Sequence, residues 1–251
     1  MIDISNARKQ YGNHEVVKSV SVKIEPNTLT TLIGSNGAGK STLLSMVGRL
    51  LDGQGEFYLE GTAIASYMGA ELAKRLSILR QTNHFSVRLR VRELVAFGRY
   101  PYSKTRLTEE DQRKVDQALA YMDMTALQNN YIDEISGGER QRAYIAMVIA
   151  QDTKYILLDE PLNNLDMVHS IHIMKLLRRL VDDYQRTVVL VLHDINFAAC
   201  YSDAIIAMRD GSLYKHGKTK EIITSEHLYK IYGIHIPVVS QNGRPYCLYH
   251  L

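Results

Sequence analysis

Apolar and polar residues alternate along this chain with two different periods, which predict strands in some segments and helices in others. Residues 16–26 alternate at every second position and predict a strand that ends at Pro26. Fully apolar runs predict further strands, buried in a sheet, at residues 29–33, 76–79, 155–159 and 187–192. Apolar positions at helical spacing predict helices at residues 41–51, 167–184 and 195–202. Strands that alternate with helices predict a mostly parallel, doubly wound sheet.

Turn signals predict where the chain reverses between shorter strands. Residues 56–59 predict a strand that a turn at residues 60–61 closes. Residues 204–209 and 212–217 predict a hairpin around the Asp-Gly pair at residues 210–211. The opening of the chain therefore predicts short strands with turns, and its later part predicts an antiparallel addition to the sheet.

The middle of the chain is richer in charge and predicts helices. One of these begins at a capping pattern formed by Thr108 and Asp111. We interpret residues 86–150 as a helical subdomain inserted into a single α/β domain that spans all 251 residues. A last helix is predicted near residues 219–232, and the tail, residues 236–251, has no interpretable pattern.

Composition excludes several classes of protein. The hydrophobic share of 45% and the charged share of 23% are those of an ordinary globular protein. The net charge of +3 argues against a broad nucleic-acid-binding surface. Cys200 and Cys247 lack metal-ligand spacing and predict two reduced thiols in a cytoplasmic protein. The N-terminus does not resemble a signal peptide, and the apolar runs fall short of the roughly 20 residues that cross a bilayer.

A glycine-rich loop, GSNGAGKST, follows the strand predicted at residues 29–33. The loop consists of Gly34, Ser35, Asn36, Gly37, Ala38, Gly39, Lys40, Ser41 and Thr42, and it fits the pattern G-x-x-x-x-G-K-[ST]. Glycines let consecutive N–H groups point inward at a phosphate, and the start of the following helix adds its positive end. We expect Lys40 to reach the β- and γ-phosphates of ATP and the Ser41 hydroxyl to bind Mg²⁺.

Four further polar side chains follow the buried strands. Asp159 and Glu160 end the strand YILLD, where Asp159 is expected to hold Mg²⁺ through water. Glu160 is expected to orient and polarise the attacking water as a general base. His193 follows the next apolar strand and can reach a γ-phosphate at the same sheet edge, and Gln81 is expected to sense Mg²⁺ and the attacking water.

A second anion-binding helix start lies far from the first, in the segment ISGGERQR. Ser136, Gly137 and Gly138 there form a γ-phosphate site at the start of an apolar helix. Because residues 34–42 already surround the phosphates of one nucleotide, the simplest interpretation is that this second site serves the ATP of another subunit. Two copies related by a two-fold axis then form a homodimer that buries two ATP molecules.

Together these motifs resemble the nucleotide-binding subunit of ATP-binding cassette (ABC) transporters, over residues 2–232. The resemblance implies an α/β P-loop NTPase core with a mostly parallel sheet, an N-terminal antiparallel β subdomain and an inserted helical subdomain. It also implies that Tyr11, in KQYGNHEVV, stacks on adenine and that Asp166, in LNNLD, belongs to the D-loop that couples two sites. In the signature, Glu139 stands where glutamine is commoner and Ile135 where leucine is commoner. Asn163 and Asn164 occupy D-loop positions that vary in the family.

Within that family the chain is most similar to ATPases of iron–siderophore importers, especially those for catecholate-type siderophores. Three phrases carry this similarity: LRQTNHFSVRLRVRELVAFGRYPYS, LLDEPLNNLDMVHS and VVLVLHDINFAACYSD. The resemblance implies a homodimer at the cytoplasmic face of the inner (plasma) membrane, under a permease pair that a separate siderophore-binding protein supplies. The segment after Gln81 is then expected to touch the permease, and Arg88, Arg90 and Arg92 form a candidate docking surface.

Other functions stay open at this point. The cargo of the importer could instead be haem, cobalamin or a hydroxamate siderophore, because the ATPase does not touch it. A non-transport cassette ATPase that acts on DNA or ribosomes is a second class, but this chain has neither two cassettes nor a strongly basic arm. A P-loop kinase is a third class, although it has no use for the second phosphate site.

Overall fold

A six-stranded central sheet brings the ends of its parallel strands to one edge. The computed structural model describes residues 1–81, 87–104, 106–163 and 165–249. The strand order is β10-β9-β3-β8-β7-β6, in which only β10 runs antiparallel to its neighbour. The strands are β3 (Leu29–Ile33), β6 (Leu76–Leu79), β7 (Tyr155–Asp159), β8 (Thr187–Val191), β9 (Ala204–Arg209) and β10 (Ser212–Lys218). The loops that follow β3, β6, β7 and β8 therefore meet at the same edge.

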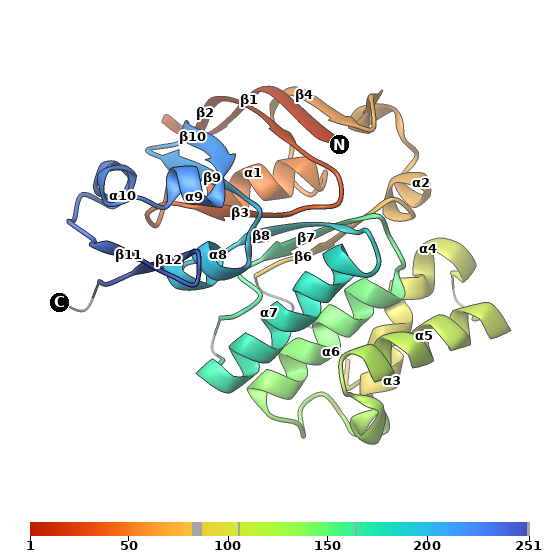
Figure 1. Cartoon of the computed structure of the whole chain (residues 1–251). Helices are drawn as coiled ribbons and strands as arrows, with labels where there is room; N and C mark the ends of the chain where they lie inside the picture. The colour runs from red at the N-terminus through yellow and green to blue at the C-terminus, as the bar shows by residue number, and fades with distance from the viewer. Residues whose placement is uncertain (82–86, 105, 164, 250–251) are drawn as a thin grey trace.

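A second, fully antiparallel sheet lies beside the first. Its order is β2-β1-β4-β5, and its strands are β1 (Ile2–Tyr11), β2 (His14–Ile24), β4 (Gln54–Leu59) and β5 (Thr62–Ala63). The helix α1 (Lys40–Val47) lies between this sheet and the central sheet (Figure 1). One face of the central sheet is thus covered by α1 and the antiparallel strands.

Helices cover the opposite face of the central sheet (Figure 1). In the chain α2 (Gly69–Ala73) precedes β6, and the described residues between β6 and β7 form four helices. These are α3 (Val91–Ala96), α4 (Tyr100–Ser103), α5 (Glu109–Tyr121) and α6 (Gly137–Ala150). The later helices are α7 (Met167–Asp182), α8 (Ile195–Tyr201), α9 (Thr219–Ile222) and α10 (Ser225–Tyr232). Short 3₁₀ turns occur at Ile64–Ser66, Phe97–Arg99 and Thr125–Leu127.

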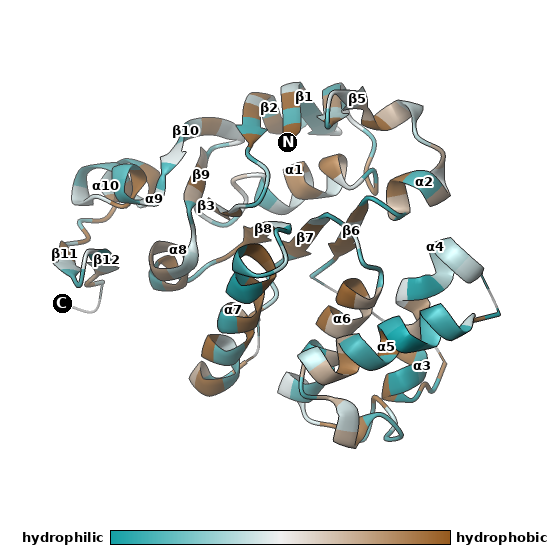
Figure 2. Cartoon of the chain, turned by 45° about the vertical axis from the view of Figure 1, so that its right-hand side comes forward, coloured by the Kyte–Doolittle hydropathy of each residue, from teal (hydrophilic) through white to brown (hydrophobic). Residues whose placement is uncertain are grey.

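The central strands separate two apolar cores. Leu157 packs in the core with α1 and the antiparallel sheet, whereas the next residue, Leu158, packs in the core with the helices of the other face. Figure 2 shows the resulting hydrophobic colour of β6, β7 and β8 in the middle of the molecule. Both faces of these strands are buried, which explains their continuous apolar runs in the sequence.

The predicted fold class is confirmed, with its mostly parallel sheet, its N-terminal antiparallel sheet and its inserted helices. The capping pattern at Thr108 is also confirmed, because its hydroxyl accepts the Asp111 N–H at 3.2 Å. Among the described residues, no helix combines the length and the apolar character needed to span a bilayer.

One expectation for the C-terminal region was wrong. The single helix expected near residues 219–232 is two helices, because Thr224 adopts an extended conformation and caps α10 by accepting the His227 N–H. The tail forms a hairpin of β11 (Val238–Gln241) and β12 (Arg244–Cys247). Its turn is Asn242–Gly243, both at positive φ, which is the residue pair that two-residue hairpin turns prefer.

Candidate nucleotide-binding site

The glycine loop between β3 and α1 is held by close backbone contacts. A Cβ on Gly34 would lie 2.2 Å from the carbonyl oxygen of Met208, and one on Gly39 would lie 2.6 Å from that of Val16. Gly39 also has a φ of 90°, in the left-handed region, directly before α1. Larger side chains cannot fit at these two positions, so the loop keeps a shape in which its N–H groups face inward.

Lys40 is buried inside this loop, with 5% of its surface exposed. Its Nζ donates to the carbonyl oxygens of Gly34 at 2.8 Å and Ser35 at 2.9 Å. Burial lowers the pKa of Lys40, while the nearby carboxylates of Glu160 and Asp159 oppose that shift. The Lys40 amine is therefore held in a position from which it can pair with a phosphate bound by the loop.

Ser41 and Asp159 lie side by side, although 118 positions separate them in the chain. The Ser41 hydroxyl donates to Asp159 Oδ1 at 2.7 Å. Burial raises the pKa of Asp159, the Ser41 hydrogen bond lowers it, and the neighbouring Glu160 raises it again. A buried carboxylate whose ionised form is disfavoured is well suited to a cation, which would offset that cost.

Glu160 is the centre of the polar cluster. Its Oε1 lies 2.6 Å from His193 Nε2, and its Oε2 accepts the Gln81 amide at 2.6 Å and also the Asn163 amide. The residue is buried and has a φ of 51°, in the left-handed region that glutamate seldom occupies. Such strained conformations occur at functional sites, where the surrounding structure enforces them.

One pocket of about 310 Å³ collects most of the predicted site residues. It is lined by Val16, Asn36, Gly37, Ala38, Gly39, Lys40, Ser41, Thr42, Gln81, Glu160 and His193. The structure thus brings together the glycine loop and the side chains that follow β6, β7 and β8.

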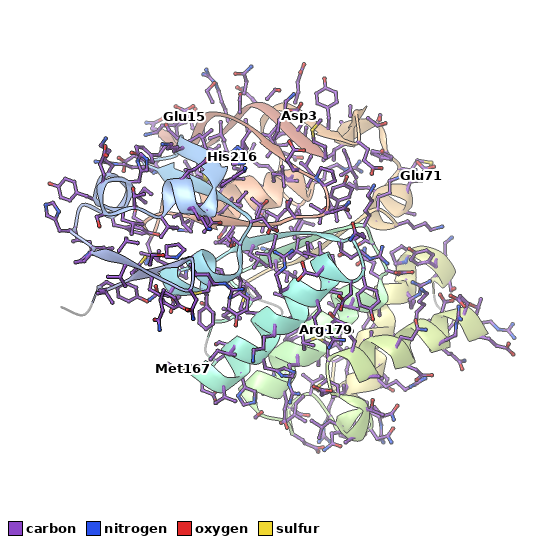
Figure 3. The ribbon with its side chains drawn as sticks, viewed as in Figure 1. Asp3, Glu15, Glu71, Met167, Arg179 and His216 are labelled. Carbon is purple, nitrogen blue, oxygen red and sulfur yellow. The ribbon has the colours of Figure 1, made fainter. Side chains whose placement is uncertain are left out.

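The second predicted phosphate site lies elsewhere on the molecule. Ser136, Gly137 and Gly138 do not line the pocket, and neither does Asp166. Ser136 is the exposed N-cap of α6, and Asp166 is the N-cap of α7. Figure 3 shows Met167, the residue after Asp166, at the outer end of α7.

The N-terminal ends of α6 and α7 contact each other. A Cβ on Gly138 would lie 3.0 Å from the His169 ring, whose Nδ1 lies 2.9 Å from Asp166 Oδ1. The Glu139 carboxylate accepts hydrogen bonds from the Ser136 N–H at 2.9 Å and from the Ser136 hydroxyl at 2.8 Å. These bonds lower the pKa of Glu139, so a negative charge lies directly beside the Ser136 hydroxyl.

Tyr11 also lies outside the pocket lining, at the end of β1. Its side chain is 50% exposed, and Lys9 Nζ lies 5.1 Å from its ring centre. Val16, on the neighbouring strand β2, does line the pocket. The exposed ring is therefore accessible to a stacking partner.

Sequence reasoning about the site missed two residues, one that lines the pocket and one that contacts Glu160. Val16 lies in an ordinary alternating strand that gives no signal of ligand contact. Asn163 was noted only as a variable position, yet its amide donates to Glu160. Asn164 and residues 82–86, the first part of the segment after Gln81 that is expected to touch the permease, lie outside the described residues.

Comparison with known proteins decides the family. The sequence profile of the ABC transporter family matches residues 17–163. The chain belongs to the ABC transporter family. The petrobactin import ATP-binding protein YclP of Bacillus subtilis (strain 168) is 52% identical over 95% of both chains. The petrobactin import ATP-binding protein FatE of Bacillus anthracis is 47% identical over 99% of this chain and 100% of its own.

Related proteins also differ in cargo and show the assembled state of such cassettes. The iron(3+)-hydroxamate import ATP-binding protein FhuC of Bacillus subtilis (strain 168) is 38% identical, over 95% of this chain and 90% of its own. Among solved structures, the dimeric ABC transporter cassette MJ0796 matches with a TM-score of 0.78 and 29% identity, over 87% of this chain and 99% of that one. A post-hydrolysis state of the same cassette is a dimer bound to ADP and Pi.

Proposed function

We propose that this ABC ATPase hydrolyses ATP to power the import of a ferric siderophore through a membrane permease pair. The observation that carries the catalytic part is the convergence of Gln81, Asn163 and His193 on the Glu160 carboxylate, beside the glycine loop. Nothing in a purely structural strand end requires three polar side chains on one buried carboxylate.

The glycine loop is proposed to bind the phosphates of ATP, with Lys40 as the cation that faces the β- and γ-phosphates. Its amine is already directed into the loop by Gly34 and Ser35. Tyr11 is proposed to stack on the adenine, because its ring is exposed at the end of a strand whose neighbour lines the pocket.

Magnesium fits the pair of oxygen donors formed by Ser41 and Asp159. Mg²⁺ prefers a few hard oxygen ligands from protein and completes its shell with phosphate oxygens and water. When bound, it would neutralise charge on the phosphates as the γ-phosphoryl group leaves. Asp159 is suited to this role because burial disfavours its ionised form unless a cation is near.

Glu160 is proposed to act as the general base toward the attacking water. Its Oε1 and Oε2 are held by His193 and Gln81, so its orientation is fixed before ATP arrives. General-base assistance contributes roughly 10²–10⁴-fold in rate. His193 is proposed to contact the γ-phosphate and Gln81 to report the state of the metal and water.

The Ser136 loop is proposed to close the site from a second copy of the chain. Ser136 is exposed and lies outside the Lys40 pocket, so one protomer does not complete the site by itself. The dimeric cassette MJ0796 supports this arrangement. We propose that the homodimer works at the cytoplasmic face of the membrane.

The cargo is proposed from the relatives. The two relatives named for petrobactin import are 52% and 47% identical, whereas the one named for hydroxamate import is 38% identical. A ferric siderophore of the petrobactin kind is therefore the first candidate, ahead of hydroxamates, haem and cobalamin.

The test is radiolabelled iron uptake by cells whose only copy of this chain carries Glu160→Gln. Ferric petrobactin, ferric enterobactin, a ferric hydroxamate and haem are offered in turn, with wild-type cells as the control. We expect selective loss of petrobactin-bound iron, or of both petrobactin and enterobactin. Undiminished uptake of all four would contradict the siderophore assignment, and full ATP turnover by the purified variant would contradict the role of Glu160.

A further inference from the structure

The C-terminal residues 232–249 reach two loops of the nucleotide site without lining its pocket. They comprise the end of α10, the β11–β12 hairpin and Tyr249. Ile236 and Cys247 are buried in the core that contains the helices, and Tyr232, Val238 and Tyr249 pack against it. This segment, which we name the C-terminal bracket, is therefore firmly packed in the fold.

The first contact concerns the turn that carries His193. Asp194 caps α8, because its Oδ1 accepts the N–H groups of Asn196 at 2.7 Å and Phe197 at 3.2 Å. The Tyr249 hydroxyl donates to the same oxygen at 3.2 Å. Burial, with the nearby Asp194 carboxylate, raises the pKa of Tyr249 to about 12, so the hydroxyl stays protonated as a donor.

The second contact fixes the first turn of α8. The Asn196 amide donates to the Cys247 carbonyl at 3.1 Å, and the Cys247 N–H donates to the Asn196 side-chain oxygen at 2.7 Å. This reciprocal pair ties β12 to the residue that lies three positions after His193. His193 contacts Glu160, and the bracket holds the turn that follows His193, so the orientation of that turn depends on the bracket.

The third contact reaches the glycine loop. The Tyr232 hydroxyl, at the end of α10, lies close enough to the Gly34 backbone for that backbone to lower the pKa of Tyr232, against the larger effect of burial, which raises it. Gly34 has no space for a side chain, because an added Cβ would lie 2.2 Å from the Met208 carbonyl oxygen. The bracket therefore touches both the loop that begins at Gly34 and the turn that presents His193.

We propose that the C-terminal bracket positions His193 against Glu160, with Tyr249 and Asn196 as positioning residues that act through the Asp194 turn. Tyr232 positions the start of the glycine loop in the same way. This proposal rests on the proposed roles of His193 and Glu160 in ATP hydrolysis. It gives the C-terminal hairpin a function in catalysis although none of its residues lines the pocket.

The test compares steady-state ATP hydrolysis by the full-length protein and its Tyr249→Phe variant. Loss of one hydrogen bond to a charged group predicts a kcat about 3–10-fold lower, with KM for ATP within about twofold of wild type. Asn196→Ala, which removes the second contact, is expected to act in the same direction. Tyr229→Phe is the matched control, because Tyr229 is exposed on α10 and stacks on His235 away from the site.

A double-mutant cycle distinguishes positioning from general destabilisation. In a His193→Ala background, adding Tyr249→Phe should change kcat by less than about 1.5-fold, because the residue it positions is gone. Equal effects with and without His193, or a lower melting temperature with kcat unchanged, would overturn the proposal. If Glu160→Gln abolishes turnover while Tyr249→Phe does nothing, the bracket proposal fails and the proposed function stands.

Discussion

At the scale of single residues, the site depends on its polar side chains and on the lack of a side chain at Gly34. Gly34 is the clearest case, because the space for its Cβ is already occupied by a backbone carbonyl that cannot rotate away. Glu160 and Lys40 show the complementary situation, in which a charged group is buried but held by several partners. Substitutions at these positions are therefore expected to disturb the geometry of the site.

The first prediction concerns Gly34→Ala. The added Cβ overlaps the Met208 carbonyl, which lies 2.2 Å away, so β3, β9 or the loop must shift. Overpacking of this kind costs about 1–3 kcal/mol of unfolding free energy, and it also distorts the phosphate loop. Thermal unfolding and ATP-binding titrations should both show the loss. Gly69→Ala is the control, since its Cβ meets no atom within 4 Å and Gly69 opens a helix.

The second prediction concerns Glu139→Gln. Glutamine can still accept the Ser136 hydrogen bonds, but it removes a negative charge from the proposed γ-phosphate site. We expect the ATP-dependent dimer to dissociate about threefold less readily, the scale of an exposed charge interaction. Analytical ultracentrifugation in a Glu160→Gln background, where ATP is retained, measures this. A weaker dimer would show instead that the carboxylate supports the loop.

At the scale of elements, a buried ion pair joins α5 to the 3₁₀ turn Phe97–Arg99. Arg99 Nε donates to Asp111 Oδ1 at 2.8 Å, and both side chains are buried. Burial alone would raise the pKa of Asp111, but hydrogen bonds from Ser103, Thr108 and Arg99 outweigh it and hold the pKa well below its usual range. The helices that follow β6 are therefore joined by charge as well as by apolar packing.

The third prediction is that Asp111→Asn destabilises the protein by about 3–5 kcal/mol, because it leaves the Arg99 cation buried without its partner. Since the folded pKa of Asp111 is depressed, its stabilisation is present above about pH 4 and is lost as pH falls toward the folded pKa. Denaturant unfolding should thus show the difference between wild type and variant shrinking as the pH falls below about 4. The exposed Glu110–Arg113 pair supplies the control, Glu110→Gln, which should change stability by less than about 0.5 kcal/mol.

The sequence predicts the sheet and most of the pocket because each depends on local signals. Runs such as 155–159 are apolar on both sides of the sheet, and parallel strands must present Asp159, Gln81 and His193 at one edge. The C-terminal hairpin carries an Asn242–Gly243 turn signal, but its strands are partly exposed and lack a regular alternation. The contact of Asn163 with Glu160 depends on the path of the loop that carries Asn163. Local sequence patterns do not predict that path.

At the scale of the whole molecule, the chain carries the two proposed halves of a nucleotide site on different parts of its surface. The pocket with Lys40 lies at the edge of the central sheet, and the Ser136 loop lies at the end of α6. Within one chain the two proposed halves lie apart and do not form one site. This separation is the feature of the sequence and fold that predicts a dimer.

The fourth prediction separates binding within one chain from closure by another. In a Glu160→Gln background, Ser136→Arg should leave the ATP affinity of the monomer within about twofold and weaken ATP-dependent dimerisation at least tenfold. Fluorescent-nucleotide titration and sedimentation velocity measure the two properties. An equal loss of both would place Ser136 in the same site as Lys40 of its own chain.

The left-handed backbone of Glu160 has an evolutionary consequence. At a φ of 51°, glycine or asparagine has a lower conformational energy than glutamate. Selection for stability alone would therefore replace glutamate at this position. Under the proposed role of Glu160 as the general base, glutamate at this position reflects selection for turnover over stability. Libraries of this protein screened only for heat resistance should therefore recover substitutions at 160 that raise the melting temperature of an inactive enzyme.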